Sequence, residues 1–220
     1  MCGRFTLTHD AKYIEQTFDV SDGIEFSANY NITPTQSIPV IWQTEAKSRK
    51  ISLMHWGLIP HWSTQPSSKY IMINARADTL AEKPSYRDAY QHRRCLIPAD
   101  GFFEWHTETG KKQPYYILMH EHRLFAFAGL WECWQGEQTL HSCTVITTEA
   151  NSLIQGIHDR MPVILQTEDY DNWLNPDIQQ ASQLNKLLKP YAGTNLKMYP
   201  VSSEVNYPGN NHPGLIQELS

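Results

Sequence analysis

The sequence of 220 residues lacks the long apolar stretches that mark membrane proteins. No run approaches the roughly 18 consecutive apolar residues that indicate a transmembrane helix. The first residues, up to Leu7, also lack the basic stretch followed by a hydrophobic stretch that forms a secretory signal. We therefore expect no membrane span and no export signal, and a soluble protein of the cytoplasm.

Cysteine and positive charge are also scarce. The four cysteines include no CxxC pair, and their irregular spacing fits a reducing compartment better than a disulfide framework. Cys95, Cys133 and Cys143 lie in apolar, strand-like segments, which indicates small core residues. The formal net charge of -5 argues against indiscriminate nucleic-acid binding, because such binding depends on neutralising phosphates. A local basic site stays compatible with that charge.

Several motifs of catalysis and cofactor binding are missing. The chain has no Walker loop, no Gly-x-Gly-x-x-Gly, no HExxH and no Gly-x-Ser-x-Gly, which disfavours nucleotide hydrolysis and zinc proteolysis. His120 and His122 form a His-x-His pair on a polar turn, but one such pair without further ligands is a poor metal site. We therefore expect neither a metal nor a cofactor.

The pattern that is present predicts one α+β domain over residues 1–220, with mostly antiparallel strands, a barrel-like core and short peripheral helices. No repeat, low-complexity tract or long Pro/Gly linker divides the chain. A hydrophobic content of 40% supports one sizeable core. Strand-like stretches bounded by turn residues occur at 2–7, 38–43, 51–58, 95–105, 115–120, 124–134, 142–148, 163–166 and 196–201.

Helical spacing is confined to short segments. Ala11, Ile14 and Phe18 predict a helix over 9–18 with Thr8 as its cap. Pro84 separates two further predicted helices, over 74–83 and 86–92. Others are expected over 149–155, from Thr167 onwards, and over 178–188. The Pro, Gly and Asn residues of 207–220 predict a loop or tail.

Cys2 has the most distinctive chemistry, because it directly follows Met1. Removal of Met1 leaves an α-amine and a thiol on the same residue. The pKa of an α-amine lies near 7.8, so roughly a third is neutral at about pH 7.5, against about 0.1% for lysine. Such an amine can form an imine with an aldehyde, and the thiol can close the imine to a thiazolidine. On the dipeptide alone, an ordinary small residue is the more common interpretation.

A set of short segments occurs along the chain in an order that closely resembles the SRAP family, the SOS response-associated peptidases also described as abasic-site processing proteins. The resemblance spans nearly the whole chain, from Met1 to Asn206. Its segments are Met1-Cys-Gly-Arg-Phe5, Tyr30-Asn-Ile-Thr-Pro-Thr-Gln36, Trp56-Gly-Leu-Ile-Pro-His-Trp62, Ile73-Asn-Ala-Arg-Ala-Asp78, Arg94-Cys-Leu-Ile-Pro-Ala-Asp-Gly-Phe-Phe-Glu-Trp105, Phe127-Ala-Gly-Leu-Trp131, Ile157-His-Asp-Arg-Met-Pro-Val163 and Val201-Ser-Ser-Glu-Val-Asn206.

The resemblance implies a sensor of abasic sites in single-stranded DNA. In this interpretation Met1 is lost, mature Cys2 captures the ring-opened aldehyde of the lesion, and a stable thiazolidine crosslink between protein and DNA results. The protein would associate with the nucleoid when bound to damaged DNA. We expect a monomer.

Three further residues are candidates for the chemistry. Glu104 lies in an apolar strand, where burial would raise its pKa and suit it to proton transfer; an outward-facing strand glutamate is the alternative. The resemblance assigns His158 to proton transfer on the imine, which suits an imidazole, whereas such a loop histidine is more often structural. Asn74 can orient the amine and the sugar hydroxyl through its amide, or simply cap a helix.

Binding of single-stranded DNA needs phosphate contacts and surfaces on which bases can stack. The resemblance points to Arg4, Arg76 and Arg160 for the phosphates, because the guanidinium fork donates paired hydrogen bonds. It also points to apolar surfaces and to a further DNA contact, at Pro34, Trp62 and Thr147. Ser63 follows Trp62, where some relatives carry a second aromatic residue, so the resemblance implies a single aromatic ring at this point of the chain.

Two other classes of function stay open from the sequence. The first is an N-terminal-nucleophile cysteine peptidase or amidohydrolase, in which Cys2 attacks a carbonyl; self-removal of Met1 fits this hypothesis equally. The second is a non-catalytic binder of single-stranded DNA, for which Cys2 would be incidental.

Overall fold

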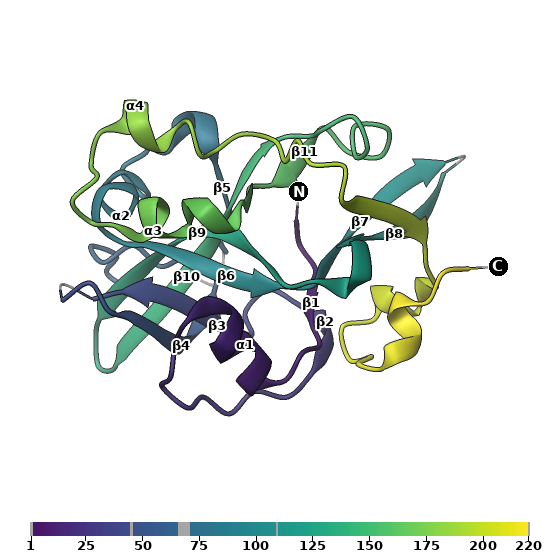
Figure 1. The fold of residues 1–220 in the computed structure, drawn as a ribbon, viewed down its shortest axis with the longest axis horizontal. Helices are drawn as coiled ribbons and strands as arrows, with labels where there is room; N and C mark the ends of the chain where they lie inside the picture. Colours follow the sequence, from purple (N-terminus) through teal and green to yellow (C-terminus); the bar gives the residue numbers. More distant parts are fainter. Residues whose placement is uncertain (1, 45, 66–70, 109, 220) are drawn as a thin grey trace.

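The computed structural model describes residues 2–44, 46–65, 71–108 and 110–219 (Figure 1). Met1 and Ser220, to which parts of the sequence analysis refer, lie outside them. Within the described ranges, no helix is long and apolar enough to cross a bilayer.

A closed ring of five strands forms the centre of the larger, eight-stranded sheet. β10 pairs with β4, β4 with β3, β3 with β6, β6 with β9, and β9 again with β10. The ring is mostly antiparallel, since only β10 and β4 run parallel. It confirms the predicted barrel-like core. Its strands are β3 (Ser37–Gln43), β4 (Arg49–Trp56), β6 (Arg94–Ala99), β9 (Phe125–Gln135) and β10 (Thr139–Glu149).

Three short strands extend this sheet beyond the ring. They are β5 (Asn74–Arg76) and β11 (Arg160–Pro162), which both pair with β10, and β12 (Ile164–Leu165), which pairs with β9. The prediction of a helix over residues 74–83 is therefore wrong. The hydrogen bonds of β5 to β10 fix Asn74, Ala75 and Arg76 in an extended conformation, and only a 3-10 turn follows, at Ala77–Thr79.

The second sheet has five strands in the order β13, β8, β7, β1 and β2, and every pair is antiparallel. It carries the N-terminal strand between two neighbours, so the segment before β1 is held against β7. In Figure 1 this segment runs from β1 towards β11. The strands are β1 (Phe5–Leu7), β2 (Asn29–Ile32), β7 (Gly101–Glu108), β8 (Lys111–Met119) and β13 (Leu196–Pro200).

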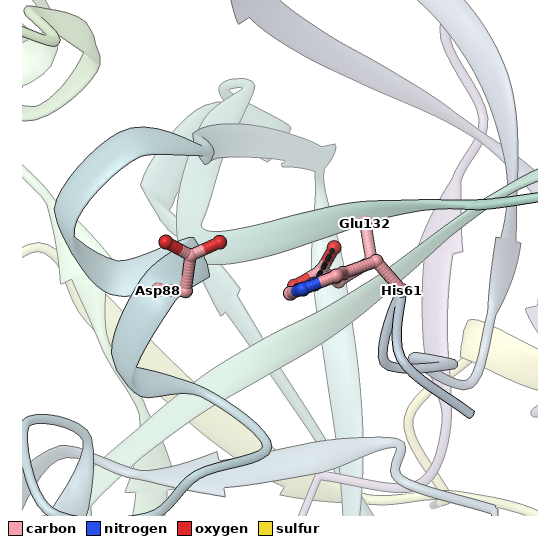
Figure 2. A group of neighbouring side chains, drawn as sticks. All are labelled: His61, Asp88 and Glu132. Atoms are coloured by element: carbon pink, nitrogen blue, oxygen red, sulfur yellow. Dashed lines mark hydrogen bonds and ion pairs between the residues drawn. The ribbon is translucent and has the colours of Figure 1, made fainter.

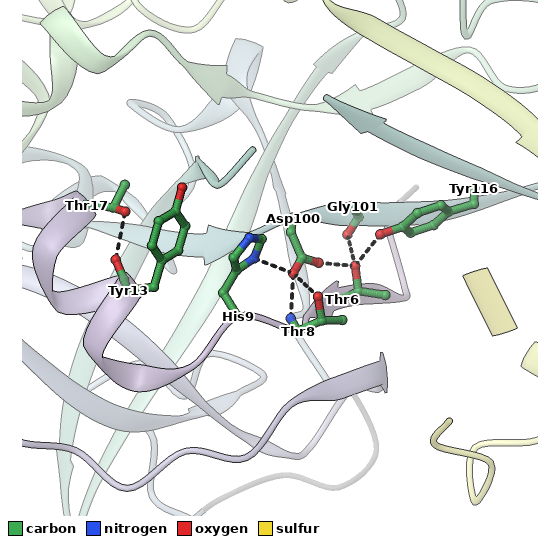
Figure 3. Close-up of polar contacts among 8 residues, drawn as sticks. All are labelled: Thr6, Thr8, His9, Tyr13, Thr17, Asp100, Gly101 and Tyr116. Carbon is green, nitrogen blue, oxygen red and sulfur yellow. Dashed lines mark hydrogen bonds and ion pairs between the residues drawn. The ribbon is translucent and has the colours of Figure 1, made fainter. Parts of the chain in front are cut away.

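Asp100 marks the passage from one sheet to the other (Figure 3). Residues 95–105 were expected to form one strand-like run, but the chain divides there into β6 and β7. The buried Asp100 carboxylate accepts hydrogen bonds from the Thr6 and Thr8 hydroxyls and the Thr8 amide, and lies 3.1 Å from His9 Nδ1. These bonds tie β1 to the β6–β7 junction. They also explain why Thr8 does not cap α1.

The helices are short and peripheral, as predicted. Asp10 caps α1, its carboxylate accepting the Tyr13 amide at 2.8 Å, and the buried Ile14 and Phe18 face the core. The α-helices are α1 (Ala11–Phe18), α2 (Arg87–His92), α3 (Tyr170–Leu174) and α4 (Ala181–Leu184), and further 3-10 turns lie at His120–His122, Thr167–Asp169, Ser203–Asn206 and Pro213–Ile216.

Of two further predicted helices, one is replaced by turns and the other is much shorter than expected. The segment 149–155 begins inside β10 and continues as turns, because Asn151 Oδ1 accepts the Ile154 amide in a local side-chain turn. The segment 178–188 contains only α4, after which Lys186 and Leu187 donate to carbonyls three residues back. Leu184 and Leu188 are nevertheless buried, as their apolar spacing predicts.

The predicted tail is part of the packed structure. Leu215 is fully buried in a small cluster with Phe103 and Val205, and Val201 pairs with Glu218 as a β-bridge. The Asn31 amide donates to the carbonyls of Val205, Tyr207 and Asn210. Residues 207–219 therefore lie against β2, and composition alone missed the apolar anchor at Leu215.

Candidate active site

Cys2 lies buried at the N-terminal end of the second sheet. The Phe103 amide donates to the Arg4 carbonyl at 3.0 Å, which continues the ladder between β1 and β7 towards Cys2. From the other side, Asn74 Nδ2 donates to the Cys2 carbonyl at 2.9 Å. Two strands from different sheets, β7 and β5, therefore fix the position of Cys2.

Glu104 faces the interior close to Cys2. Its exposed fraction is only 3%, so the outward-facing alternative is wrong. Burial raises the pKa of the Glu104 carboxyl, and the positive field of His158 opposes that rise. Burial likewise raises the pKa of the Cys2 thiol, and the negative field of Glu104 raises it further. These effects place Glu104 within electrostatic reach of both Cys2 and His158.

His158 comes from the turn before β11 and is partly exposed. Its Nδ1 accepts the Arg160 backbone amide at 2.9 Å, so in the neutral ring the proton sits on Nε2. Asp159 Oδ1 lies 2.9 Å from the same nitrogen and becomes an ion partner only when the ring is protonated. The turn therefore holds the imidazole by one edge, with Nε2 as its donor in the neutral form.

Asn74 occupies the first position of β5, opposite Val145 of β10, so it does not cap a helix. Its backbone carbonyl accepts the Tyr86 hydroxyl at 3.3 Å. Its Nδ2 is used by Cys2, whereas its buried Oδ1 accepts no hydrogen bond from any residue that the structure describes. A buried acceptor of this kind is suited to a hydroxyl or amine of a bound substrate.

A cavity of about 810 Å³ opens beside these residues. It lies between the end of β7 and the turn that carries His158. Arg76, His158 and Arg160 line it, while Cys2, Asn74 and Glu104 are not among the described lining residues. Its other walls are formed by Trp105, His106, Thr107, Glu149, Ala150, Gln155, Gly156, Ile157 and Asp159.

The two arginines at this cavity differ in their freedom. Arg76 is exposed and makes a bidentate pair with Asp78, with Nε at 3.1 Å and one terminal nitrogen at 2.6 Å. Arg160 is mostly buried and donates to the carbonyl and hydroxyl of Thr147. Thr147 is itself fully buried, so its side chain holds Arg160 instead of facing solvent.

Arg4 is committed to the protein. One terminal nitrogen donates to Asn31 Oδ1 at 2.7 Å and to the Val205 carbonyl, and the guanidinium lies 5.8 Å from the centroid of the Trp105 ring. Burial lowers the pKa of Arg4. This arginine therefore links β1 to the C-terminal segment.

Trp62 and Pro34 lie on other turns and are not among the described residues that line the cavity. Trp62 is 58% exposed, in the turn that follows β4. Pro34 is half-buried, and Thr35 after it has a φ of 74°.

Comparisons with known proteins identify the family of this chain. The family model of the SOS response associated peptidases, SRAP, matches residues 1–208. The chain belongs to the SRAP family. The abasic site processing protein YoqW of Bacillus subtilis strain 168 is 44% identical over 223 residues, covering 99% of each chain. The abasic site processing protein HMCES of Xenopus tropicalis is 34% identical over 224 residues, covering 87% of this chain and 66% of that protein. A crystal structure of a protein from Bacteroides thetaiotaomicron superposes with a TM-score of 0.89 at 27% identity, covering 100% of both chains.

The structure adds residues to this SRAP site that the sequence analysis missed. Trp105 and Thr107 contribute the β7 wall of the cavity, and Gln155 contributes to the opposite wall. Tyr86 supports the backbone of Asn74. For Trp105 no signal was available, because it directly follows Glu104 in a strand and alternation therefore points it to the other face.

One group of side chains in the described part of this SRAP chain has the composition of a metal site: His61, Asp88 and Glu132 (Figure 2). Their candidate ligand atoms lie within 4.8 Å of one another. However, a terminal nitrogen of Arg93 donates to Asp88 and, at 2.8 Å, to Glu132. This guanidinium supplies the positive charge that a metal ion would otherwise provide, so the group is an ion-pair cluster.

Proposed function

We propose that this chain processes abasic sites in single-stranded DNA, and that Cys2, exposed by removal of Met1, captures the lesion covalently. Membership of the SRAP family and relatives named as abasic site processing proteins support the substrate. The observations that carry the chemistry are the hydrogen bond from Asn74 to the buried Cys2 and the position of Glu104 within electrostatic reach of both Cys2 and His158.

The reaction joins the amine and the thiol of one residue to one carbon. The α-amine of Cys2 adds to the aldehyde of the ring-opened sugar and gives a carbinolamine, which loses water to form an imine. The thiol then adds across the C=N bond, with sulfur bonding to carbon and the hydrogen passing to nitrogen. The thiazolidine forms with release of one water, and no oxidant or reductant is needed.

The raised pKa of the Cys2 thiol sets the order of these steps. Because burial and the charge of Glu104 disfavour the thiolate, the thiol stays protonated near neutral pH. An α-amine is substantially neutral in that range. The amine therefore attacks first, and the thiol closes the ring once the imine has formed.

Glu104 moves the protons in this scheme. Its raised pKa lets the carboxyl retain a proton to higher pH than an exposed glutamate does. It can then protonate the leaving hydroxyl of the carbinolamine and take a proton back when the thiol adds. His158 exchanges protons with the imine through Nε2, and the Asn74 Oδ1 acceptor orients the opened sugar.

The positions of the arginine side chains indicate the path of the DNA strand. Arg76 and Arg160 line the same cavity and bind the phosphates on either side of the lesion. Arg4 contributes indirectly, because its guanidinium lies over Trp105, which forms part of the cavity wall. Pro34 and Trp62 supply apolar surfaces, and the buried Thr147 acts on DNA through Arg160. Sequence preference is low, because an abasic site presents no base to read.

Mass spectrometry of the protein with an abasic oligonucleotide tests the proposal. We expect one adduct with the mass of the Met1-free chain plus the oligonucleotide minus one water. The Cys2→Ala variant should give no such adduct while still binding intact single strands. A chain that retains Met1 should also give none. Properly processed protein that forms no adduct would refute the proposal.

The family name favours a second candidate, in which Cys2 is the nucleophile of a peptidase. A cysteine nucleophile needs a thiolate, and such sites lower the thiol pKa. Here the pKa of Cys2 is raised, which disfavours peptide cleavage in trans. Turnover of peptides by the mature chain would reverse this ranking. A purely non-covalent binder would show unchanged affinity and no adduct with or without Cys2.

A further inference from the structure

Trp62 is an exposed aromatic side chain on a turn that is fixed on both sides. The turn follows β4, and the Trp62 side chain is 58% exposed, whereas most of the other tryptophans are buried or half-buried. Before it, the Ile59 amide donates to Ser142 Oγ at 2.9 Å, and within it the Ser63 amide donates to the Pro60 carbonyl at 2.9 Å. An apolar ring held outward by an ordered backbone indicates a binding surface.

Strand β9 holds the residue that follows Trp62. The Trp134 indole N–H donates to the Ser63 carbonyl at 2.7 Å, a short bond for this donor and acceptor. Trp134 is itself partly buried on β9. The bond therefore fixes the backbone of the turn directly after Trp62.

The same strand holds the residue that precedes Trp62. Glu132 lies two positions before Trp134, so both side chains leave the same face of β9. The buried Glu132 carboxylate is anchored by Arg93, and His61 Nδ1 lies 3.4 Å from it (Figure 2). Glu132 Oε2 accepts no hydrogen bond from the described residues, so it is available to a closer approach of His61.

We propose that Glu132 and Trp134 are positioning residues, which clamp the two neighbours of Trp62 and present its ring as a fixed stacking surface for a base of single-stranded DNA. The ligand class rests on the proposed function. One flat ring between two polar anchors matches base stacking, whereas protein partners use apolar patches of several hundred Å². Fixing the ring before binding removes the entropic cost of ordering it on the DNA.

A double-mutant cycle on an intact, fluorescein-labelled oligothymidine tests this, with affinity read by anisotropy at low salt. We expect Trp62→Ala to weaken binding about fivefold to 150-fold, the range for loss of one stacked base. Trp134→Phe, which keeps an aromatic ring but removes the donor, should weaken it about twofold to tenfold. In the Trp62→Ala background, Trp134→Phe should have no further effect, because it acts only through Trp62.

A matched control is available on β3. Trp42 Nε1 donates to Ser52 Oγ at 3.2 Å, so Trp42→Phe removes a comparable bond from a residue that does not hold the turn. It should leave the affinity unchanged. Undiminished weakening by Trp134→Phe in the Trp62→Ala background would overturn the proposal, as would unchanged affinity in either single variant. Because the strand is intact, these results are independent of whether an abasic adduct forms.

Discussion

Replacement of Glu104 by Gln separates the role of this carboxyl in proton transfer from any role in the fold. The substitution keeps the size of the side chain and removes the group that ionises. General acid–base catalysis by one positioned group contributes roughly 100-fold to 10,000-fold. We therefore expect the rate of crosslinking at saturating abasic DNA to fall by that factor, which corresponds to about 3 to 5 kcal/mol of barrier.

The same substitution has a predictable effect on stability. Burial raises the pKa of Glu104 in the folded chain above its unfolded value. The stabilising protonated form is fully populated below the unfolded pKa of about 4.3, and its contribution is lost as the pH rises through the folded pKa. Above the unfolded pKa the wild-type chain therefore loses part of this stabilising contribution, because burial disfavours ionisation of the Glu104 carboxyl. Glu104→Gln should unfold at a higher urea concentration at pH 7.5, and this advantage should vanish below about pH 4.

Single-turnover crosslinking on denaturing gels, urea unfolding and the affinity for intact single strands are the three measurements. The matched control is Glu168→Gln, the same change at an exposed glutamate in the 3-10 turn at Thr167–Asp169, which should leave the rate at saturating DNA unchanged. Equal losses of binding and crosslinking in Glu104→Gln, or lower stability at pH 7.5, would contradict the assigned role and make Glu104 a structural residue.

Three further substitutions test other parts of the structure. Leu215→Ala should lower the free energy of unfolding by about 2 to 5 kcal/mol in urea titrations, because Leu215 is fully buried; a change below about 0.5 kcal/mol would fit a free tail instead. Asp78→Asn should tighten binding of intact single strands about twofold to fivefold at low salt and little at high salt, because it releases Arg76 from an exposed ion pair; weaker binding would mean that Asp78 positions Arg76. Burial raises the pKa of Asp100, but its hydrogen bonds outweigh this effect and hold the pKa below its usual value. Asp100→Asn should therefore lower the free energy of unfolding by about 2 to 4 kcal/mol at pH 7 and weaken the dependence of stability on pH below about pH 4. If that pH dependence is unchanged in the variant, Asp100 is not its source.

The parts of the fold that local patterns specify were predictable from the sequence. The spacing of Ile14 and Phe18 predicted α1, and alternating residues predicted most long strands. The failures have a common cause. Asn74 belongs to a strand only because β10 pairs with it. Leu215 is buried only because Phe103 and Val205 pack in the same cluster. Such non-local partners leave no trace in a short window of sequence.

The candidate site divides in the same way. Residue type and neighbours single out Cys2 and Glu104 as candidates, and in the structure Glu104 lies within electrostatic reach of both Cys2 and His158. The sequence could not show that Thr147 is buried and holds Arg160, because the alternation of a strand does not reveal which of its faces is covered. Nor could the sequence show that Arg4 is already bonded to Asn31 and Val205.

The C-terminal segment contacts the N-terminal end of the chain through two side chains. Val205 supplies a carbonyl to Arg4, two residues from Cys2, and also to Asn31 on the adjoining strand. Cleavage by a protease just beyond Val205, or a bulky fusion there, would break the hydrogen bonds of its carbonyl to Arg4 and Asn31. The backbone next to Cys2 would then be held less firmly. The position of Cys2 therefore depends on the far end of the chain, through contacts that involve neither Glu104 nor His158.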